Sequence, residues 1–321
     1  MTSRLSFACA LVFVSVLWGR AFAQTPAGDD PAWKWPESRW RSTVERVRAG
    51  RRLLPTAWPD GARAAVALSF DFDNDTPSLR DGRTSPSVLS QGEYGARTAL
   101  PRVLALLERY RIPATFFIPA VSAKLYPEEV KRIAAAGHEI GVHGWIHERN
   151  SLLEREDERD LMKRAITTLT EISGKKPVGM RTPSWDYSPS TLDLVKELGL
   201  LYDSSLMADD SPYEVLSSGK PTGIVELPVE WILDDFPYFG MDRFSTTRPY
   251  TPPSHVLEIW AAEFDGAYEE RGLFLLTMHP HVIGHRSRIQ MLEKLVQHIR
   301  QRSGIWWATH EQVARHVKDA R

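Results

Sequence analysis

Two carboxylates, Asp71 and Asp73, follow the apolar run AAVALSF and have a spacing that could do chemistry. Side chains two residues apart on an extended chain point to the same side, so both acids would face one place. Like charges held that close disfavour double ionisation, which indicates a cation between them or a proton-transfer role for one of them. The alternative is an Asp-rich turn that binds its own backbone amides. We expect that simpler role for Asp75.

Two histidines, His143 and His147, lie four residues apart in the segment GHEIGVHGWIHE. Their rings come onto one face if the chain turns into a helix after a strand, which is the spacing of a two-histidine metal site. The spacing alone is more typical of ordinary surface or core histidines. Combined with one carboxylate, however, the pair makes an N,N,O ligand set that leaves positions open for water and substrate, as in catalytic metal sites.

Strands and helices alternate along the chain from residue 64 onward, in an α/β pattern. Apolar runs of strand length are separated by helical stretches and fall at 64–70, 114–120, 138–142, 178–181, 199–202, 224–229, 272–278 and 305–307. Repeated strand-then-helix units with nearly continuous apolar strands predict a parallel sheet covered by helices. Seven or eight such units favour closure into a barrel, and both polar pairs then fall at the barrel end where strands finish and chemistry gathers.

The composition is that of a globular chain. Hydrophobic residues make up 42% of the 321 residues and charged residues 25%, which excludes a disordered or fibrous protein. The formal net charge of −1 gives no electrostatic footprint for nucleic acid or anionic lipid. We therefore expect no nucleic-acid partner and no stable membrane insertion.

The N-terminus predicts a removable signal peptide over residues 1–23. Arg4 precedes an apolar run, and Ala21-Phe22-Ala23 suits signal peptidase; an uncleaved anchor is the alternative. The mature chain would be exported, periplasmic or secreted. The single cysteine lies inside this leader, so we expect no disulfide. Residues 24–60, rich in Trp and Arg, predict an N-terminal arm that could also pack on a second subunit, and residues 61–321 predict one catalytic domain.

Six motifs occur in an order that resembles the polysaccharide deacetylase family, also called the NodB-homology domain or carbohydrate esterase family 4. They are SFDFD, GHEIGVHGWIHE, RTPSWD, YDSSL, LPVEW with LDD, and LTMHPHVIG. The branch it resembles contains the helicobacter-type peptidoglycan deacetylases and the allantoinase-like proteins. The resemblance extends from about residue 58 to the C-terminus. It implies a distorted (β/α) barrel of about seven parallel strands that binds zinc or another divalent ion.

The resemblance implies a role for each residue of the two polar pairs. Asp71 matches the general base, and Asp73, His143 and His147 match the metal ligands. The commonest family pattern has adjacent aspartates, whereas Phe72 separates them here. This departure agrees with the branch named above, and it leaves open which of the two acids binds the metal.

The arginine of the segment RTPSWD matches a family residue that pairs with the catalytic base. Arg181 beside Asp71 would hold the carboxylate ionised and aim its oxygens; a surface salt bridge is the alternative. Pro183 and Trp185 would shape the pocket wall, and Trp185 could stack on a sugar ring or pack in the core.

A histidine after the strand GLFLLTM matches the general acid of the family. His279 follows the strand directly and is the preferred candidate, while His281 is its competitor and a candidate substrate contact. Asp234, Asp235 and Tyr238 are further candidate contacts, or else parts of a solvated acidic loop. The remaining histidines toward the C-terminus are expected as surface or capping residues: His285, His298, His310 and His316.

Three functions fit these residues. The first is metal-dependent N-deacetylation of an exported or cell-envelope polysaccharide, with Asp71, His279 and Arg181 as the catalytic residues. The second is hydrolysis of a cyclic amide or imide at the same site, as in the allantoinase-like relatives. The third is a carbohydrate-binding protein without activity. The substrate is accordingly expected to be a carbohydrate or a small amide.

Overall fold

The computed structural model describes residues 30–241 and 250–319. The predicted signal peptide, residues 1–23, lies outside the described residues. The chain divides into two compact units, residues 1–43 and 44–321, and each is described by itself. In the smaller unit, the indole N–H groups of Trp35 and Trp40 donate to the carbonyls of Asp30 and Ala32, so this short segment folds back on itself.

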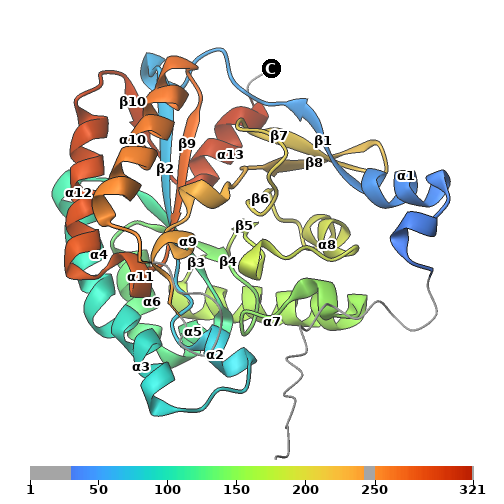
Figure 1. The fold of residues 1–321 in the computed structure, drawn as a ribbon, viewed down its shortest axis with the longest axis horizontal. Coiled ribbons are helices and arrows are strands. Elements are labelled where there is room, and N and C mark those ends of the chain that lie inside the picture. Colours follow the sequence, from blue (N-terminus) through green and yellow to red (C-terminus); the bar gives the residue numbers. More distant parts are fainter. Residues whose placement is uncertain (1–29, 242–249, 320–321) are drawn as a thin grey trace, which may run out of the picture. The chain divides into compact units, whose positions relative to one another are not determined.

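Ten strands form one sheet, and Figure 1 labels them within the fold. The strands are β1 (Val47–Arg52), β2 (Ala64–Asp71), β3 (Ala114–Ile118), β4 (Glu139–Val142), β5 (Gly179–Met180), β6 (Tyr202–Asp203), β7 (Tyr213–Ser217), β8 (Lys220–Glu226), β9 (Leu273–Met278) and β10 (Ile305–Trp307).

The sheet is a distorted barrel of seven parallel strands in the order β9-β2-β3-β4-β5-β6-β8. Strand β10 adds to β2 in parallel, and β7 and β1 continue from β8 in antiparallel pairing. Within the described residues, β8 and β9 are not paired, and the segment that follows β8 reaches β9 through a single parallel bridge between Asp234 and Thr277. The predicted fold class is therefore confirmed, and the curled sheet has a seam without continuous pairing.

Helices cover the outer face of the sheet, and Figure 1 shows α4, α10 and α12 along one flank of the strands. The helices are α1 (Glu37–Glu45), α2 (Thr76–Arg80), α3 (Pro86–Tyr94), α4 (Leu100–Tyr110), α5 (Ala120–Leu125), α6 (Pro127–Ala135), α7 (Arg155–Ser173), α8 (Thr191–Glu197), α9 (Phe236–Phe239), α10 (Pro253–Glu269), α11 (Pro280–Ile283), α12 (Arg286–Arg300) and α13 (His310–Asp319). Among the described helices, none combines the length and the apolar character needed to span a bilayer.

Strand β2 separates two regions of the core. All eight of its residues are buried. Leu68 and Phe70 pack with residues of the covering helices, where burial of each such side chain contributes about 1.5–3 kcal/mol. Ala65 and Ala67 alternate with them and belong to a second cluster that includes residues of α13. Because small side chains occupy this inner face, room remains there for polar groups at the end of the strand.

The segment predicted as an arm, residues 24–60, is divided by the structure. Residues 44–60 belong to the larger unit, where β1 pairs with β7. The side chain of Trp58 is 2% exposed and its ring centroid lies 5.9 Å from that of Trp306. Four of the six residues of β1 are exposed, so the strand has no apolar alternation by which the sequence could reveal it.

A β-hairpin follows β6, and its first strand lies between the predicted strands 199–202 and 224–229, where the sequence analysis places none. Ser218 and Gly219 join β7 to β8, with φ angles of 48° and 77°. Positive φ at both central residues is typical of the type I′ turn that matches the twist of paired strands. Strand β8 consequently starts and ends earlier than the predicted 224–229.

Gly179→Ala should destabilise the barrel. A Cβ at Gly179 would overlap the ring of Tyr202, its partner on β6, whose hydroxyl donates to the buried Glu139 at 2.7 Å. Overpacking of this kind costs about 1–3 kcal/mol, which should lower the melting temperature by several degrees. The matched control is Gly266→Ala in α10, where a Cβ meets no atom within 4 Å and the higher helix propensity of alanine should stabilise. Equal melting temperatures for the two variants would contradict the prediction.

Candidate functional site

The two aspartates are placed by the end of β2. The N–H of Phe72 donates to the carbonyl of Phe117 at 2.8 Å, so the chain stays extended beyond the strand. The Phe72 ring packs in the outer core. The flanking side chains of Asp71 and Asp73 therefore point to the opposite, inner side, where both are buried. The phenylalanine between them is the spacer that brings the two acids together.

His143 and His147 are brought together by a bend after β4, rather than by the helix that the sequence analysis gave as the condition for their rings to share a face. The carboxylate of Glu148 accepts hydrogen bonds from the N–H groups of Trp145 and Ile146 at 2.7–2.9 Å, which closes the turn. His147 itself adopts a left-handed φ of 62°. The two imidazole centroids lie 5.1 Å apart.

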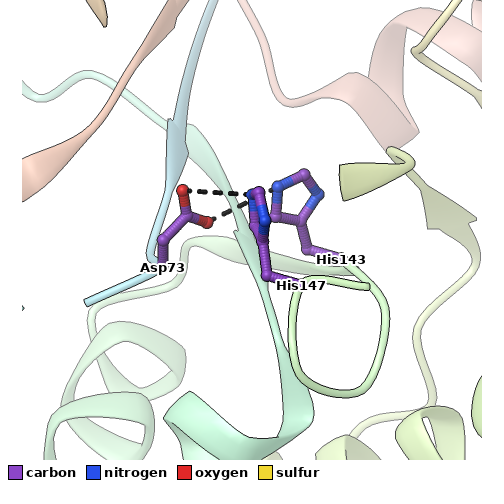
Figure 2. Close-up of side chains that lie close together, drawn as sticks. All are labelled: Asp73, His143 and His147. Carbon is purple, nitrogen blue, oxygen red and sulfur yellow. Dashed lines mark ion pairs between the residues drawn. The ribbon is translucent and has the colours of Figure 1, made fainter. Parts of the chain in front are cut away.

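Asp73, His143 and His147 converge on one point, as Figure 2 shows. Nε2 of His143 lies 3.5 Å from Oδ1 of Asp73, and Nε2 of His147 lies 3.5 Å from Oδ2. Oδ1 of Asp73 is buried and has no hydrogen-bond partner within the described residues. Nδ1 of His143 donates to the carbonyl of Arg181 at 2.8 Å, which leaves the Nε2 lone pair facing Asp73. The three residues are consistent with a divalent metal site.

Arg80, which the sequence analysis did not single out, lies behind His147. Its Nη1 is 3.1 Å from both Nδ1 and the carbonyl oxygen of His147. Burial, followed by the charges of His143 and Arg80, lowers the pKa of His147 well below its usual value. The ring is therefore neutral, the state in which a histidine binds a metal.

Arg181 makes a buried ion pair with Asp71. Its Nη1 is 2.7 Å from Oδ1 of Asp71 and donates to Oγ of Ser69 at 2.9 Å. Ser204 accepts from Nε and Nη2 through its carbonyl oxygen and its hydroxyl, both at 3.0 Å. Burial alone would raise the pKa of Asp71, but Arg181 first, and then nearby histidines, hold it below its ordinary value. Asp71 is therefore a carboxylate at neutral pH.

His310 is buried against Arg181, which corrects its assignment as a surface or capping residue. It is 0% exposed and its Nε2 lies 3.4 Å from Nη2 of Arg181. Burial, with the arginine charge, lowers the pKa of His310 well below its usual value, so the ring is neutral. Phe117 packs on the guanidinium from another side, with its ring centroid 4.3 Å away. The contacts with these neighbours fix the orientation of the Arg181 side chain.

His279 completes the cluster from the end of β9. Its Nδ1 lies 2.7 Å from Oδ1 of Asp235 and 3.6 Å from Oδ1 of Asp234, and its Nε2 lies 3.7 Å from Oδ2 of Asp73. Burial alone would lower the pKa of His279, but the charge of Asp234 and the hydrogen bond to Asp235 raise it well above its usual value. Atoms of Asp234, Asp235 and His279 are also close enough to hold a metal. The short hydrogen bond to Asp235 and the raised pKa favour a different interpretation, in which His279 is a charged imidazolium oriented by the Asp235 carboxylate.

The remaining candidate substrate contacts are Trp185, Tyr238 and His281. The indole of Trp185 is 7% exposed and lies 4.1 Å, between centroids, from that of Trp231, which is 47% exposed. The hydroxyl of Tyr238 donates to the carbonyl of Ile232, so the structure shows it bonded within its own loop. His281 lies beside His279 with ring centroids 5.8 Å apart. Burial, with the charge of His279, lowers the pKa of His281 to about 3, which leaves it neutral.

The acids, histidines and paired arginine lie at the ends of the barrel strands, where the active sites of such barrels are built. Residues 63–202 match the family model described as polysaccharide deacetylase. The chain is 31% identical to the peptidoglycan deacetylase of Helicobacter pylori, over 78% of this chain and 94% of that protein.

Two solved structures are similar along nearly their whole length. One, from Mycobacterium smegmatis and assigned to the polysaccharide deacetylases, aligns with a TM-score of 0.78 and 36% identity, over 84% of this chain and 95% of that one. The other, Puue allantoinase, aligns with a TM-score of 0.72 and 26% identity, over 83% and 93%. This chain belongs to the polysaccharide deacetylase family. It is accordingly a hydrolase of carbon–nitrogen bonds other than peptide bonds.

Proposed function

We propose that this protein removes N-acetyl groups from an exported or cell-envelope polysaccharide. The observation that carries the proposal is the convergence of three kinds of group on one buried point. Asp71 is ionised beside Arg181, His279 is charged beside Asp235, and Asp73 with the two histidines forms a ligand set. A base, an acid and a metal site are the parts that amide hydrolysis needs.

Asp73, His143 and His147 would hold a divalent ion, which we propose is zinc because two imidazoles and a carboxylate are ligands that zinc accepts. Such an ion would supply Lewis-acid polarisation of the amide carbonyl and would lower the pKa of a bound water. His143 is already oriented for this role by its bond to the Arg181 carbonyl.

The chain's own residues then move two protons. Asp71, held as a carboxylate, takes a proton from the attacking water. Arg181 keeps its pKa low and fixes the orientation of its oxygens. His279, held charged by Asp234 and Asp235, donates a proton from Nε2 to the departing nitrogen, because an amine is otherwise a very poor leaving group.

The substrate class rests on the relatives and on two aromatic side chains. The relatives from Helicobacter pylori and Mycobacterium smegmatis carry names of peptidoglycan and polysaccharide deacetylases. The half-exposed Trp231, backed by Trp185, offers a face on which a sugar ring could stack. The N-terminal leader pattern supports export to the periplasm or the medium, where such polymers are found.

Hydrolysis of a cyclic amide or imide is a second candidate. The similarity to Puue allantoinase over 83% of the chain favours it. The same base, acid and ligand set would open a ring amide, so the site alone does not distinguish the two substrates. The leader pattern supports the polysaccharide, because a small metabolite is more often degraded inside the cell.

Purified mature protein should release acetate from N-acetylated glycans, in proportion to its content of zinc. Chelation should abolish this release and added zinc should restore it, since the ion supplies the polarisation of the carbonyl. Acetate release and ring opening of cyclic amides are measured side by side. Ring opening without acetate release would replace the first candidate by the second, and glycan binding without either reaction would show a carbohydrate-binding protein.

A further inference from the structure

Asp203 and Glu226 form a buried acid pair outside the site described above. They lie directly opposite each other on β6 and β8, and both are 0% exposed. Their neighbours along the strands, Tyr202 and Val225, belong to the inner cluster. Because side chains alternate along a strand, the two acids point to the outer face, away from the ligand set.

The two carboxyl groups act on each other at these paired positions, with no cation placed between them among the described residues. Oδ2 of Asp203 and Oε2 of Glu226 are both buried and have no hydrogen-bond partner within the described residues. Two buried carboxylates repel and leave both of these oxygens without a donor, whereas one proton held between them would remove the repulsion and give both oxygens a partner. Burial raises the pKa of both groups, for Asp203 to about 6 and for Glu226 well above its usual value.

The other titratable and charged groups around the pair leave this proton in place. Tyr187 and Tyr213 are near enough to be affected by the pair, and burial raises the pKa of both hydroxyls, so both stay neutral. Glu158, on α7, acts on Tyr187 and raises its pKa further. The charge of Arg181 acts in the opposite direction on Asp203, but burial outweighs it.

Asp203 and Glu226 accept hydrogen bonds from the Ser204–Ser205 turn, and this turn accepts hydrogen bonds from Arg181. Oε1 of Glu226 accepts from the N–H groups of Ser205 and Leu206, both at 2.8 Å, and Oδ1 of Asp203 accepts from the Ser205 hydroxyl at 2.8 Å. Ser205 Oγ also accepts from the N–H of Thr182 at 2.8 Å. The next residue back, Ser204, carries the carbonyl and hydroxyl that accept from the guanidinium.

We propose that Asp203 and Glu226 share one proton and, in that state, act as positioning residues that fix the Ser204–Ser205 turn and so the contact of Arg181 with Asp71. The proposal rests on the proposed function in one respect, that Asp71 is the base. The shared proton itself is independent of the reaction and has its own readout in stability.

Single amide variants should be tolerated. In Glu226→Gln the amide oxygen still accepts from Ser205 and Leu206, and the amide nitrogen donates to Oδ2 of Asp203. Asp203→Asn makes the mirror arrangement. Each variant reproduces the charge and the bonding of the singly protonated pair, so each should retain most of its turnover.

The double variant Asp203→Asn/Glu226→Gln should be much worse than either. Two amide NH₂ groups would then face each other with no acceptor, which leaves buried donors unsatisfied. We expect the decrease in melting temperature of the double variant to exceed the sum of the decreases in the two single variants, as is typical of coupled neighbours. Glu226→Ala removes the turn's acceptor and should lower kcat about 100-fold, the scale of a small misplacement of a catalytic group, with less change in KM. Additive single effects, or normal turnover in a folded Glu226→Ala variant, would overturn the proposal.

The pH dependence of stability supplies the reaction-independent test. A proton held more tightly in the folded state stabilises fully below the ordinary carboxyl pKa, and that contribution is lost as pH rises through the raised pKa. The melting temperature of the wild type should therefore fall relative to Glu226→Gln as the pH rises above the ordinary carboxyl range and through the raised pKa values of the pair. The matched control is Glu158→Gln, a buried acid that accepts from Asn150, Ser188 and Thr191. Glu158→Gln should lower the melting temperature but keep the wild-type decrease with rising pH. If the melting temperature of Glu226→Gln instead follows the same pH dependence as the wild type, the shared proton is refuted.

Discussion

Asp71→Asn is expected to keep the bound metal and to lower kcat by about 10²–10⁴-fold, the contribution of a general base. The amide oxygen of asparagine can still accept the hydrogen bond of Arg181, now 2.7 Å from the carboxylate, so the arginine has no reason to move. The amide cannot take a proton from water. Binding of substrate should change little, because the base acts in the transition state.

Asp73→Asn and His147→Ala provide the contrast. Both residues face the point that the ligand atoms share, and Oδ1 of Asp73 has no other partner among the described residues. These variants should lose metal and activity together, with the fold nearly intact by circular dichroism. Metal content per chain and kcat are measured on the same preparations. Metal loss in Asp71→Asn with retention in Asp73→Asn would show that the roles of the two acids are exchanged.

The sequence predicts the parallel strands well because their burial is nearly complete. Strands β2, β3 and β9 are buried at every position, so a nearly continuous apolar run marks each of them. Strand β1 leaves most of its residues exposed and gains its place only from pairing with β7. No local pattern encodes such an edge strand, whereas the Ser218–Gly219 turn of the β7–β8 hairpin was a signal that could have been used.

The sequence predicts those residues of the candidate site that lie at the ends of strands. Asp71, Asp73, His143, Arg181 and His279 all fulfil that condition and meet in the structure. His310 reaches Arg181 from the start of α13, at a distance of 129 residues along the chain. Its burial depends on how α13 packs, and periodicity does not reveal that. The same holds for Arg80, which reaches His147 from the end of α2.

His279→Ala should abolish most turnover, by about 10²–10⁴-fold, with the metal retained. The imidazole is oriented by Asp235 at 2.7 Å, and its Nε2 lies 3.7 Å from the nearest oxygen of Asp73, within the reacting region. Pro280 follows directly and biases His279 toward an extended conformation, and the observed φ of −121° and ψ of 123° agree. Because the acid must be protonated, wild-type activity should fall as pH rises through the raised pKa of His279. The variant should lack that limb of the profile.

The leaving group separates His279 from His281 as the acid. With an ester analogue, whose alkoxide departs more readily than an amine, the loss caused by His279→Ala should shrink, since less proton transfer is needed. His281 is held neutral, with a pKa lowered to about 3, and has no proton to give at neutral pH. His281→Ala should therefore change KM more than kcat for both substrates, and its metal content serves as the control for the fold of the site. A leaving-group-dependent loss in His281→Ala, with little loss in His279→Ala, would assign the acid to His281.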